Sequence, residues 1–334
     1  MKTQLSLAAN NYCSNDQYER ERTAIFQREW LLISHQKEIP TIGDQLARMV
    51  AGYPILLVHS PDGIRAFYNV CAHRAGPLVW NGTKINSPAI HCRYHGWRYN
   101  WEGVLTKAPD FGAPCPQTQL KKVHVEIKRG LIFVCLSSPQ NNLSESYPAL
   151  WKAVEPFRLE HMPFYKEENH SLQCNWKTYA ENYLEGYHVP YLHPGLKREI
   201  KMRTYRVSVH TRSISHHVQT KEQAVYDGYW GYIWPNLAIN IYGTGFSLER
   251  IVPISTEETQ IEYLYFFEEE LSEIEILHSL EMSRTVTKED VEICEAIQHN
   301  LRSGAYTAGE LSPKHENGVG AFHQWWSQSL AKFE

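Results

Sequence analysis

The chain carries two short boxes that each pair one cysteine with one histidine, Cys71-Ala72-His73-Arg74-Ala75-Gly76-Pro77 and His91-Cys92-Arg93-Tyr94-His95-Gly96-Trp97. Each box therefore offers one thiolate and one imidazole. A Rieske [2Fe–2S] cluster needs this distribution, because one of its irons takes two cysteines and the other takes two histidines. The neutral imidazoles raise the reduction potential to roughly −150 to +300 mV. We expect Cys71, His73, Cys92 and His95 to hold such a cluster.

The residues around both boxes predict loops between strands. Gly or Pro follows the ligands in each box, where a loop tip needs special backbone angles. A zinc-stapled binding protein is the alternative, because a Cys₂His₂ zinc site uses the same four donors. Zinc motifs usually pair Cys with Cys and His with His, so the order of the ligands favours the cluster.

The composition limits the partners of this chain. Its 334 residues suffice for two domains, and the net charge of −4 comes without a basic field that would attract nucleic acid or an anionic membrane. The seven cysteines are scattered and odd in number, which predicts a reducing cytoplasm rather than a disulfide framework. The longest apolar runs are too short to span a membrane, and the first ten residues lack a signal-peptide core. We expect small molecules or redox proteins as partners.

The apolar pattern divides the chain into three parts. Residues 17–31 have helical spacing, whereas short apolar runs at 54–58, 66–70 and 130–136 predict an all-β region from about 40 to 150. A polar, linker-like segment over 137–142 marks the end of that region. Beyond it the pattern predicts a helix near 176–188, strands at 205–209, 238–242 and 260–267, and a helix over 271–302. The boundaries we expect are 1–39, 40–150 and 151–334, and the fold class is α+β.

A second group of polar residues follows Trp176. If the segment is helical, Glu181, Glu185 and His188 lie on one face. Pro190 disfavours helix at the residue before it, so we expect the helix to end there and the chain to turn. The turn can bring His193 back towards His188. Two neutral histidines and one carboxylate form the facial triad of non-haem Fe(II) oxygenases.

With these motifs the chain resembles the catalytic component of Rieske non-haem iron oxygenases, the ring-hydroxylating oxygenase α-subunit family, over nearly its whole length. The resemblance implies that His188 and His193 bind mononuclear iron and that Asp290, within Lys288-Glu289-Asp290-Val291-Glu292, is the third ligand. It also implies an all-β Rieske domain followed by a helix-grip, START-like catalytic domain with an antiparallel sheet and helices. An N-terminal segment would pack with the catalytic domain.

The resemblance further implies an assembly. Family members form head-to-tail homotrimers in which an acid links the cluster histidine of one subunit to the iron histidine of the next. Glu185 is similar to that acid, so His95 of one chain would meet Glu185 and His188 of its neighbour. Glu recurs at this position in the branch that acts on choline and carnitine, whereas many other members have Asp.

We expect a terminal oxygenase that uses O₂ to hydroxylate or oxidatively demethylate a small organic substrate, with monooxygenation favoured. Aromatic cis-dihydroxylation is the alternative, and a Rieske-type electron carrier would need only the first domain. No flavin or nicotinamide motif is present, so a separate NAD(P)H-dependent reductase or ferredoxin would supply electrons. The sequence leaves quaternary amines, aromatic acids and alkaloids open as substrates. Aromatic residues over 226–234 suit cation–π binding of a methylated ammonium, or core packing.

Overall fold

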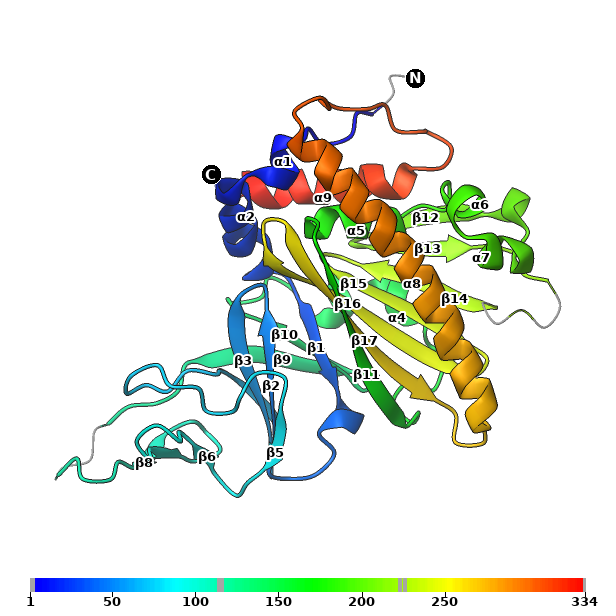
Figure 1. The fold of residues 1–334 in the computed structure, drawn as a ribbon. Helices are drawn as coiled ribbons and strands as arrows, with labels where there is room; N and C mark the ends of the chain where they lie inside the picture. Colours follow the sequence, from blue (N-terminus) through cyan, green and yellow to red (C-terminus); the bar gives the residue numbers. More distant parts are fainter. Residues whose placement is uncertain (1–3, 113–116, 222–223, 225–226, 333–334) are drawn as a thin grey trace. The chain divides into compact units, whose positions relative to one another are not determined.

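The computed structural model describes residues 4–112, 117–221, 224 and 227–332 (Figure 1). One of the seven cysteines, Cys115, and the first residue of the aromatic stretch 226–234, Tyr226, lie outside these residues. The chain forms two compact units, one made of Met1–Ile25 with Asn141–Glu334 and the other of Phe26–Gln140. Mixed helix and antiparallel sheet confirm the predicted α+β class.

The unit Phe26–Gln140 is built on antiparallel strands. Its seven-stranded sheet has the order β1-β10-β9-β4-β3-β2-β5, and a three-stranded sheet has the order β6-β7-β8. The strands are β1 (Leu31–His35), β2 (Asp44–Val50), β3 (Tyr53–Ser60), β4 (Gly63–Tyr68), β5 (Lys84–Asn86), β6 (Ile90–His91), β7 (Arg98–Tyr99), β8 (Leu105–Lys107), β9 (Lys122–Lys128) and β10 (Leu131–Cys135). A short 3₁₀ helix, η2 (Gln36–Glu38), follows β1. The first box lies between β4 and β5 and the second between β6 and β7, which confirms the prediction that both are loops between strands.

The second unit contains one seven-stranded antiparallel sheet with the order β11-β17-β16-β15-β14-β13-β12. Three of these strands overlap the predicted ones closely. The sheet consists of β11 (Phe164–Leu172), β12 (Arg206–His210), β13 (Ser213–His217), β14 (Gly228–Ile233), β15 (Leu237–Tyr242), β16 (Gly245–Ser255) and β17 (Glu258–Phe267).

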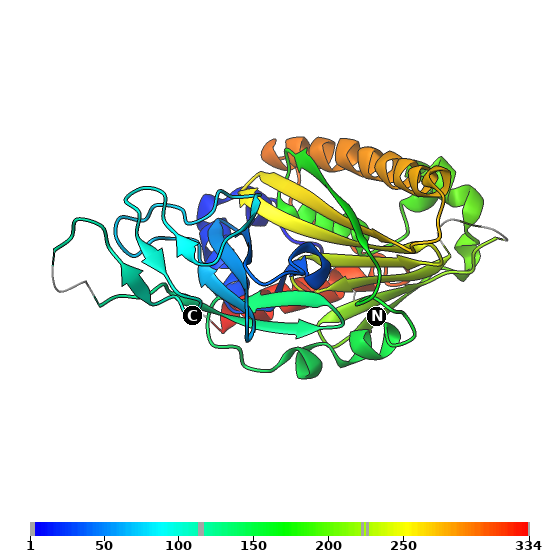
Figure 2. The same cartoon turned by 90° about the horizontal axis from the view of Figure 1, so that it is seen from below.

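Helices cover this sheet and connect its strands. The longest, α8 (Glu273–Arg302), begins with a capping box in which Ser272 and Glu275 bond to each other's backbone N–H groups. Figures 1 and 2 show α8 lying along one face of the sheet. The other helical elements are α1 (Asn10–Cys13), α2 (Asn15–Glu21), η1 (Arg22–Phe26), α3 (Leu143–Ser146), α4 (Pro148–Ala153), α5 (Trp176–Tyr183), α6 (Val189–Leu192), α7 (Pro194–Glu199), η3 (Met202–Thr204) and α9 (Asn317–Ala331).

A buried ion pair holds the N-terminal residues in the second unit. Nζ of Lys177 lies 2.7 Å from Oε1 of Glu21, and both side chains are fully buried. The indole N–H groups of Trp176 and Trp326 each donate to the same carboxylate at 2.8 Å. Since buried charges need such partners, this network ties α2 to α5 and α9.

Two predicted helices are shorter than the sequence pattern suggests. Helical structure near 17–31 ends at Phe26, because Leu31–His35 are all buried and pair with β10 as strand β1. The helix α5 ends at Tyr183, so the prediction that it extends to about His188 is wrong. Pro190 instead lies in the first turn of the separate helix α6, where a missing backbone donor costs nothing. Among the described residues, no helix has the length and apolar composition to cross a membrane.

Candidate iron and substrate site

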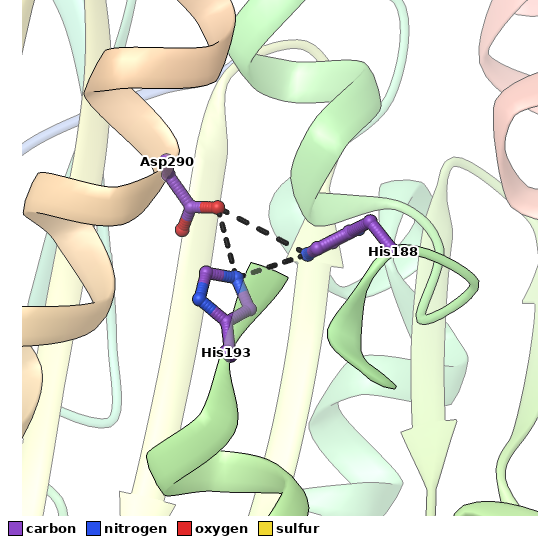
Figure 3. A group of neighbouring side chains, drawn as sticks. All are labelled: His188, His193 and Asp290. Carbon is purple, nitrogen blue, oxygen red and sulfur yellow. Dashed lines mark hydrogen bonds and ion pairs between the residues drawn. The ribbon is translucent and has the colours of Figure 1, made fainter. Parts of the chain in front are cut away.

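Three predicted ligands meet in the second unit. Nε2 of His188 lies 3.1 Å from Nε2 of His193, and Oδ1 of Asp290 lies 3.0 Å from His193 Nε2 and 3.9 Å from His188 Nε2 (Figure 3). Within the described residues, these three form the group of His, Cys, Asp and Glu side chains arranged to hold a metal ion. They come from the start of α6, the turn before α7 and the middle of α8.

The distances fit a metal ion. Ligands at adjacent octahedral positions lie about 3 Å apart when the metal–ligand bonds are about 2.1 Å long. Without a metal, two imidazole Nε2 atoms facing each other gain little, since at most one proton can lie between them. Burial alone lowers the pKa of His193, but the bonds and charges of Asp290 and Glu289 raise it above its usual value. The donor set of two imidazoles and one carboxylate suits non-haem Fe(II).

Further carboxylates and an amide orient these three side chains. Glu185 contacts Nδ1 of His188, and Oε2 of Glu289 lies 2.6 Å from Nδ1 of His193. The amide of Asn182 donates to Oδ1 of Asp290 at 2.6 Å. Each histidine is thereby held with Nε2 directed to the other, the arrangement that metal-ligating histidines usually have.

The turn between α5 and α6 explains how Glu185 reaches His188 without a helix. The carboxylate of Glu185 accepts hydrogen bonds from the backbone N–H groups of Tyr187 and His188, which lie at the start of α6. Glu181 does not join this group, although the helical spacing placed it on the same face. Its carboxylate instead accepts from Tyr12 at 2.8 Å and contacts Nε2 of His323 at 3.0 Å.

A cavity of about 140 Å³ opens beside His188, His193 and Asp290. Nine of its 25 lining residues are aromatic, and none of its lining residues in the described part of the chain is Lys or Arg. The aromatic lining residues are Tyr179, Tyr183, Tyr205, Trp230, Tyr242, Phe246, Tyr263, Tyr265 and Phe267. Of the described aromatic residues over 227–234, Trp230 lines the cavity, whereas Trp234 packs on Phe322 and Trp325 of α9.

Two buried polar residues in this cavity were not identified from the sequence. Glu249 on β16 accepts from the Tyr179 hydroxyl at 2.6 Å, and burial raises the pKa of its carboxyl to about 7. Nδ1 of His216 on β13 lies 2.8 Å from the Tyr205 hydroxyl, and burial lowers its pKa to about 3. Local sequence pattern does not mark either residue as part of a site, because their positions in one cavity depend on the order of the strands in the sheet.

The two boxes of the first unit have matching backbones. The backbone N–H of Ala75 donates to Cys71 at 3.0 Å, and that of Gly96 donates to Cys92 at 3.0 Å. The fourth residue after each cysteine has positive φ, 54° for Ala75 and 71° for Gly96. The left-handed position of the first box is therefore Ala75, not the glycine that follows it.

The side chains of the boxes fit a [2Fe–2S] cluster. Cys71 and Cys92 are buried, and the rings of His73 and His95 lie 4.6 Å apart. A Cβ atom at Gly76 would lie 3.2 Å from Sγ of Cys92, so glycine leaves the space beside the sulfur open. The imidazole side faces outward, because His95 is exposed.

Paired boxes in a β unit and a three-donor group beside an aromatic cavity define a two-site, Rieske-type iron oxygenase. The family model for the ring hydroxylating alpha subunit (catalytic domain) matches residues 149–226 and 204–332, more than half of the chain. The model for the Rieske [2Fe-2S] domain matches residues 29–124. The chain belongs to the ring-hydroxylating oxygenase α-subunit family. These matches overturn the alternatives of a zinc-stapled protein and a stand-alone electron carrier.

Several curated relatives are similar over most of their length. The carnitine monooxygenase oxygenase subunit of Escherichia coli (strain K12) is 27% identical, over 97% of this chain and 93% of that protein. The chloroplastic choline monooxygenase of Arabidopsis thaliana is 26% identical, over 88% of this chain and 76% of that protein.

Solved structures share the fold. A quaternary ammonium Rieske monooxygenase, described with carnitine oxidation by gut microbiota and inter-subunit electron transfer, has a TM-score of 0.89 at 23% identity, covering 98% of this chain and 96% of that one. Naphthalene 1,2-dioxygenase has a TM-score of 0.80 at 18% identity, covering 98% and 92%.

The family establishes the class of activity. The protein is a terminal oxygenase component that carries a Rieske [2Fe–2S] cluster and a mononuclear non-haem iron. It is an O₂-dependent oxidoreductase that acts on a small organic substrate. These findings confirm the predicted class of enzyme and its cofactors.

Proposed function

We propose that this chain is the oxygenase component of a monooxygenase that acts on a small quaternary ammonium compound. One observation carries the proposal: the cavity beside His188, His193 and Asp290 combines aromatic walls with buried carboxylate and lacks a lining Lys or Arg among the described residues. Aromatic faces attract quaternary ammonium groups through cation–π interaction. The names of the carnitine and choline monooxygenase relatives support the same class.

The charge around the cavity favours a cationic substrate over an aromatic acid. Glu185, Glu249 and Asp290 line it, and Glu289 contacts His193 from outside the lining. Their negative charges outnumber the two positive charges of Fe(II) when all four are ionised. An aromatic acid would bring a further carboxylate into this surrounding, which is costly in a buried site.

We assign the iron to His188, His193 and Asp290, and the cluster to Cys71, His73, Cys92 and His95. Iron bound by the three side chains supplies open coordination positions at which dioxygen is activated. Glu185 and Glu289 fix the two imidazoles, Asn182 fixes the carboxylate, and the aromatic walls exclude water from the substrate.

We assign Glu185 to electron transfer between subunits in a homotrimer. Its contact with Nδ1 of His188 gives it direct connection to the iron site, and the family resemblance supports a neighbour's His95 as the other end. The electrons come from a separate NAD(P)H-dependent reductase or ferredoxin. A cytoplasmic location stays a prediction from the sequence.

The proposal is tested by steady-state turnover with a ferredoxin-type reductase and NADH. Choline, L-carnitine, an aromatic acid and an alkaloid are offered separately, and oxygen uptake is compared with product formed. We expect a quaternary ammonium compound to give product coupled to oxygen uptake. Coupled turnover of the aromatic acid or the alkaloid, with none of the quaternary ammonium compounds, would contradict the proposal.

A further inference from the structure

Two buried polar side chains, His216 on β13 and Glu249 on β16, lie on the same face of the second sheet. The register pairs His216 with Trp230, Trp230 with Asn240, and Asn240 with Ser247. Glu249 follows Ser247 by two residues on β16, so it faces the same side. The strands β13 and β16 are three positions apart in the sheet, which separates their backbones by about 14 Å. Both residues line the cavity beside His188, His193 and Asp290.

Glu249 is a carboxyl group without a cationic partner. The side chain is 3% exposed, and its hydrogen bonds come from the neutral groups of Tyr179, Tyr263 and Asn240. These donors favour the ionised form, whereas burial and the nearby charge of Asp290 oppose it. Buried charges are usually paired, and no Lys or Arg lines this cavity in the described part of the chain. A cation brought by the ligand would supply the positive charge that the side chains of the cavity lining lack.

His216 also lines this cavity, and one of its ring nitrogens has no hydrogen-bond partner. The residue is 5% exposed, and Nε2 is buried with no hydrogen bond. We assign the proton of the bond at Nδ1 to the Tyr205 hydroxyl, because a phenol is a stronger acid than neutral imidazole. Nε2 then carries a proton and needs an acceptor. Buried donors are almost always satisfied, so an oxygen atom of the ligand is the partner that this N–H lacks.

We infer that Glu249 and His216 select a monocationic quaternary ammonium compound that carries an uncharged oxygen, with the cation towards Glu249 and the oxygen accepting from Nε2 of His216. This inference rests on the proposed function and narrows its substrate class. The charge of Asp290 acts on Glu249 at the cation end, and that of His188 acts on His216 at the oxygen end.

The same two residues disfavour a zwitterion. A carboxylate at the His216 end would meet one neutral N–H donor and no positive side chain of the described cavity lining. Removing a carboxylate from water with so little compensation is unfavourable. A hydroxyl group is satisfied by one donor and loses less hydration, so the hydroxyl-bearing cation binds better.

Anaerobic calorimetric titration of the iron-loaded protein tests this selection. The probes are choline, the zwitterion L-carnitine, the neutral isostere of choline with carbon in place of nitrogen, and ethyltrimethylammonium, which lacks the oxygen. We expect choline to bind about tenfold or more tightly than each of the other three. Tighter binding of the zwitterion would overturn the inference while leaving the proposed function intact. Binding of none of the quaternary ammonium probes would overturn both.

Variants of Glu249 and His216 test whether these two residues cause the preference for choline. In Glu249→Gln, the preference for choline over its neutral isostere should fall about tenfold, whereas the exposed control Glu268→Gln should keep it. In His216→Phe, the preference for choline over ethyltrimethylammonium should disappear. The variant His216→Gln should retain part of this preference, and the exposed control His217→Phe should keep all of it. Iron content and the cluster spectrum verify that each variant is folded. Unchanged preferences in folded Glu249→Gln and His216→Phe would overturn the assignment.

Discussion

Oε2 of Glu289 lies 2.6 Å from Nδ1 of His193 and so fixes the direction in which the other ring nitrogen points. The neighbouring residue, Asp290, lies 3.0 Å from that other nitrogen. One short stretch of α8 therefore provides both a ligand candidate and the group that orients a second ligand.

This contact predicts the effect of removing the orienting carboxylate. Glu289→Gln should weaken mononuclear iron binding about 10- to 100-fold, because outer partners of a metal-bound histidine set its orientation and basicity. Iron titration of the apo-site, followed by metal analysis, measures the change. The exposed neighbour Glu292 provides the control Glu292→Gln, which should bind iron like the parent. Equal iron affinity in both variants would show that Glu289 has no orienting role.

Asp290 itself is predicted to be indispensable for the mononuclear site. Asp290→Ala should lose the mononuclear iron and all substrate oxidation, because two histidines alone bind Fe(II) weakly. The red-brown colour and the electron paramagnetic resonance signal of the reduced cluster should remain, since the residues that we assign to the cluster lie in the other unit. Metal analysis and spectroscopy measure both sites in one sample. A fully active Asp290→Ala protein would refute the ligand assignment.

Glu185 is predicted to affect electron transfer more than metal content. Glu185→Gln should keep both metals but oxidise its reduced cluster at least about tenfold more slowly in the presence of substrate and O₂, because the link to His188 loses its charge. Stopped-flow absorbance at the cluster bands follows this rate. A cluster that is oxidised at the parent rate would exclude Glu185 as the bridge.

Substrate binding should depend on pH through Glu249. Burial raises the pKa of this carboxyl to about 7, so Glu249 is neutral below that pH and negatively charged above it. A quaternary ammonium compound should therefore bind more tightly as the pH rises, by up to about tenfold per unit below pH 7, and level off above it. Titrations across this range compare the parent with Glu249→Gln. A dependence of equal size in both proteins would assign it to another group.

The sequence predicted the chemistry of both sites better than their surroundings. Cys71, His73, Cys92 and His95 were proposed as cluster ligands because a cluster requires those donors at short spacing. The elements β10, β17 and α8 followed apolar patterns of the right period. The predicted end of α5 was wrong. Pro190 was interpreted as marking the end of one helix, although it lies in the first turn of another. Local pattern does not distinguish these two roles of proline.

The polar residues of the cavity could not be found from local pattern at all. Glu249 and His216 lie on strands that are neighbours only through two others, so their meeting depends on the order of the sheet. Glu289 was visible as one of several acids on a helix, but its contact with His193 depends on where α8 crosses the turn before α7. The positions of Glu249, His216 and Glu289 in the site follow from the tertiary structure, which local sequence patterns do not reveal.

A single-turnover experiment tests the central claim, oxidation of a quaternary ammonium substrate at the site of His188, His193 and Asp290. The protein is chemically reduced, freed of reductant, and mixed with choline and ¹⁸O₂ in one turnover, with Asp290→Ala treated in parallel. The account predicts ¹⁸O-labelled oxidised substrate and an oxidised cluster in the parent, and no product in the variant. Equal product from both proteins, or an oxidised cluster without any oxidised substrate in the fully iron-loaded parent, would contradict it.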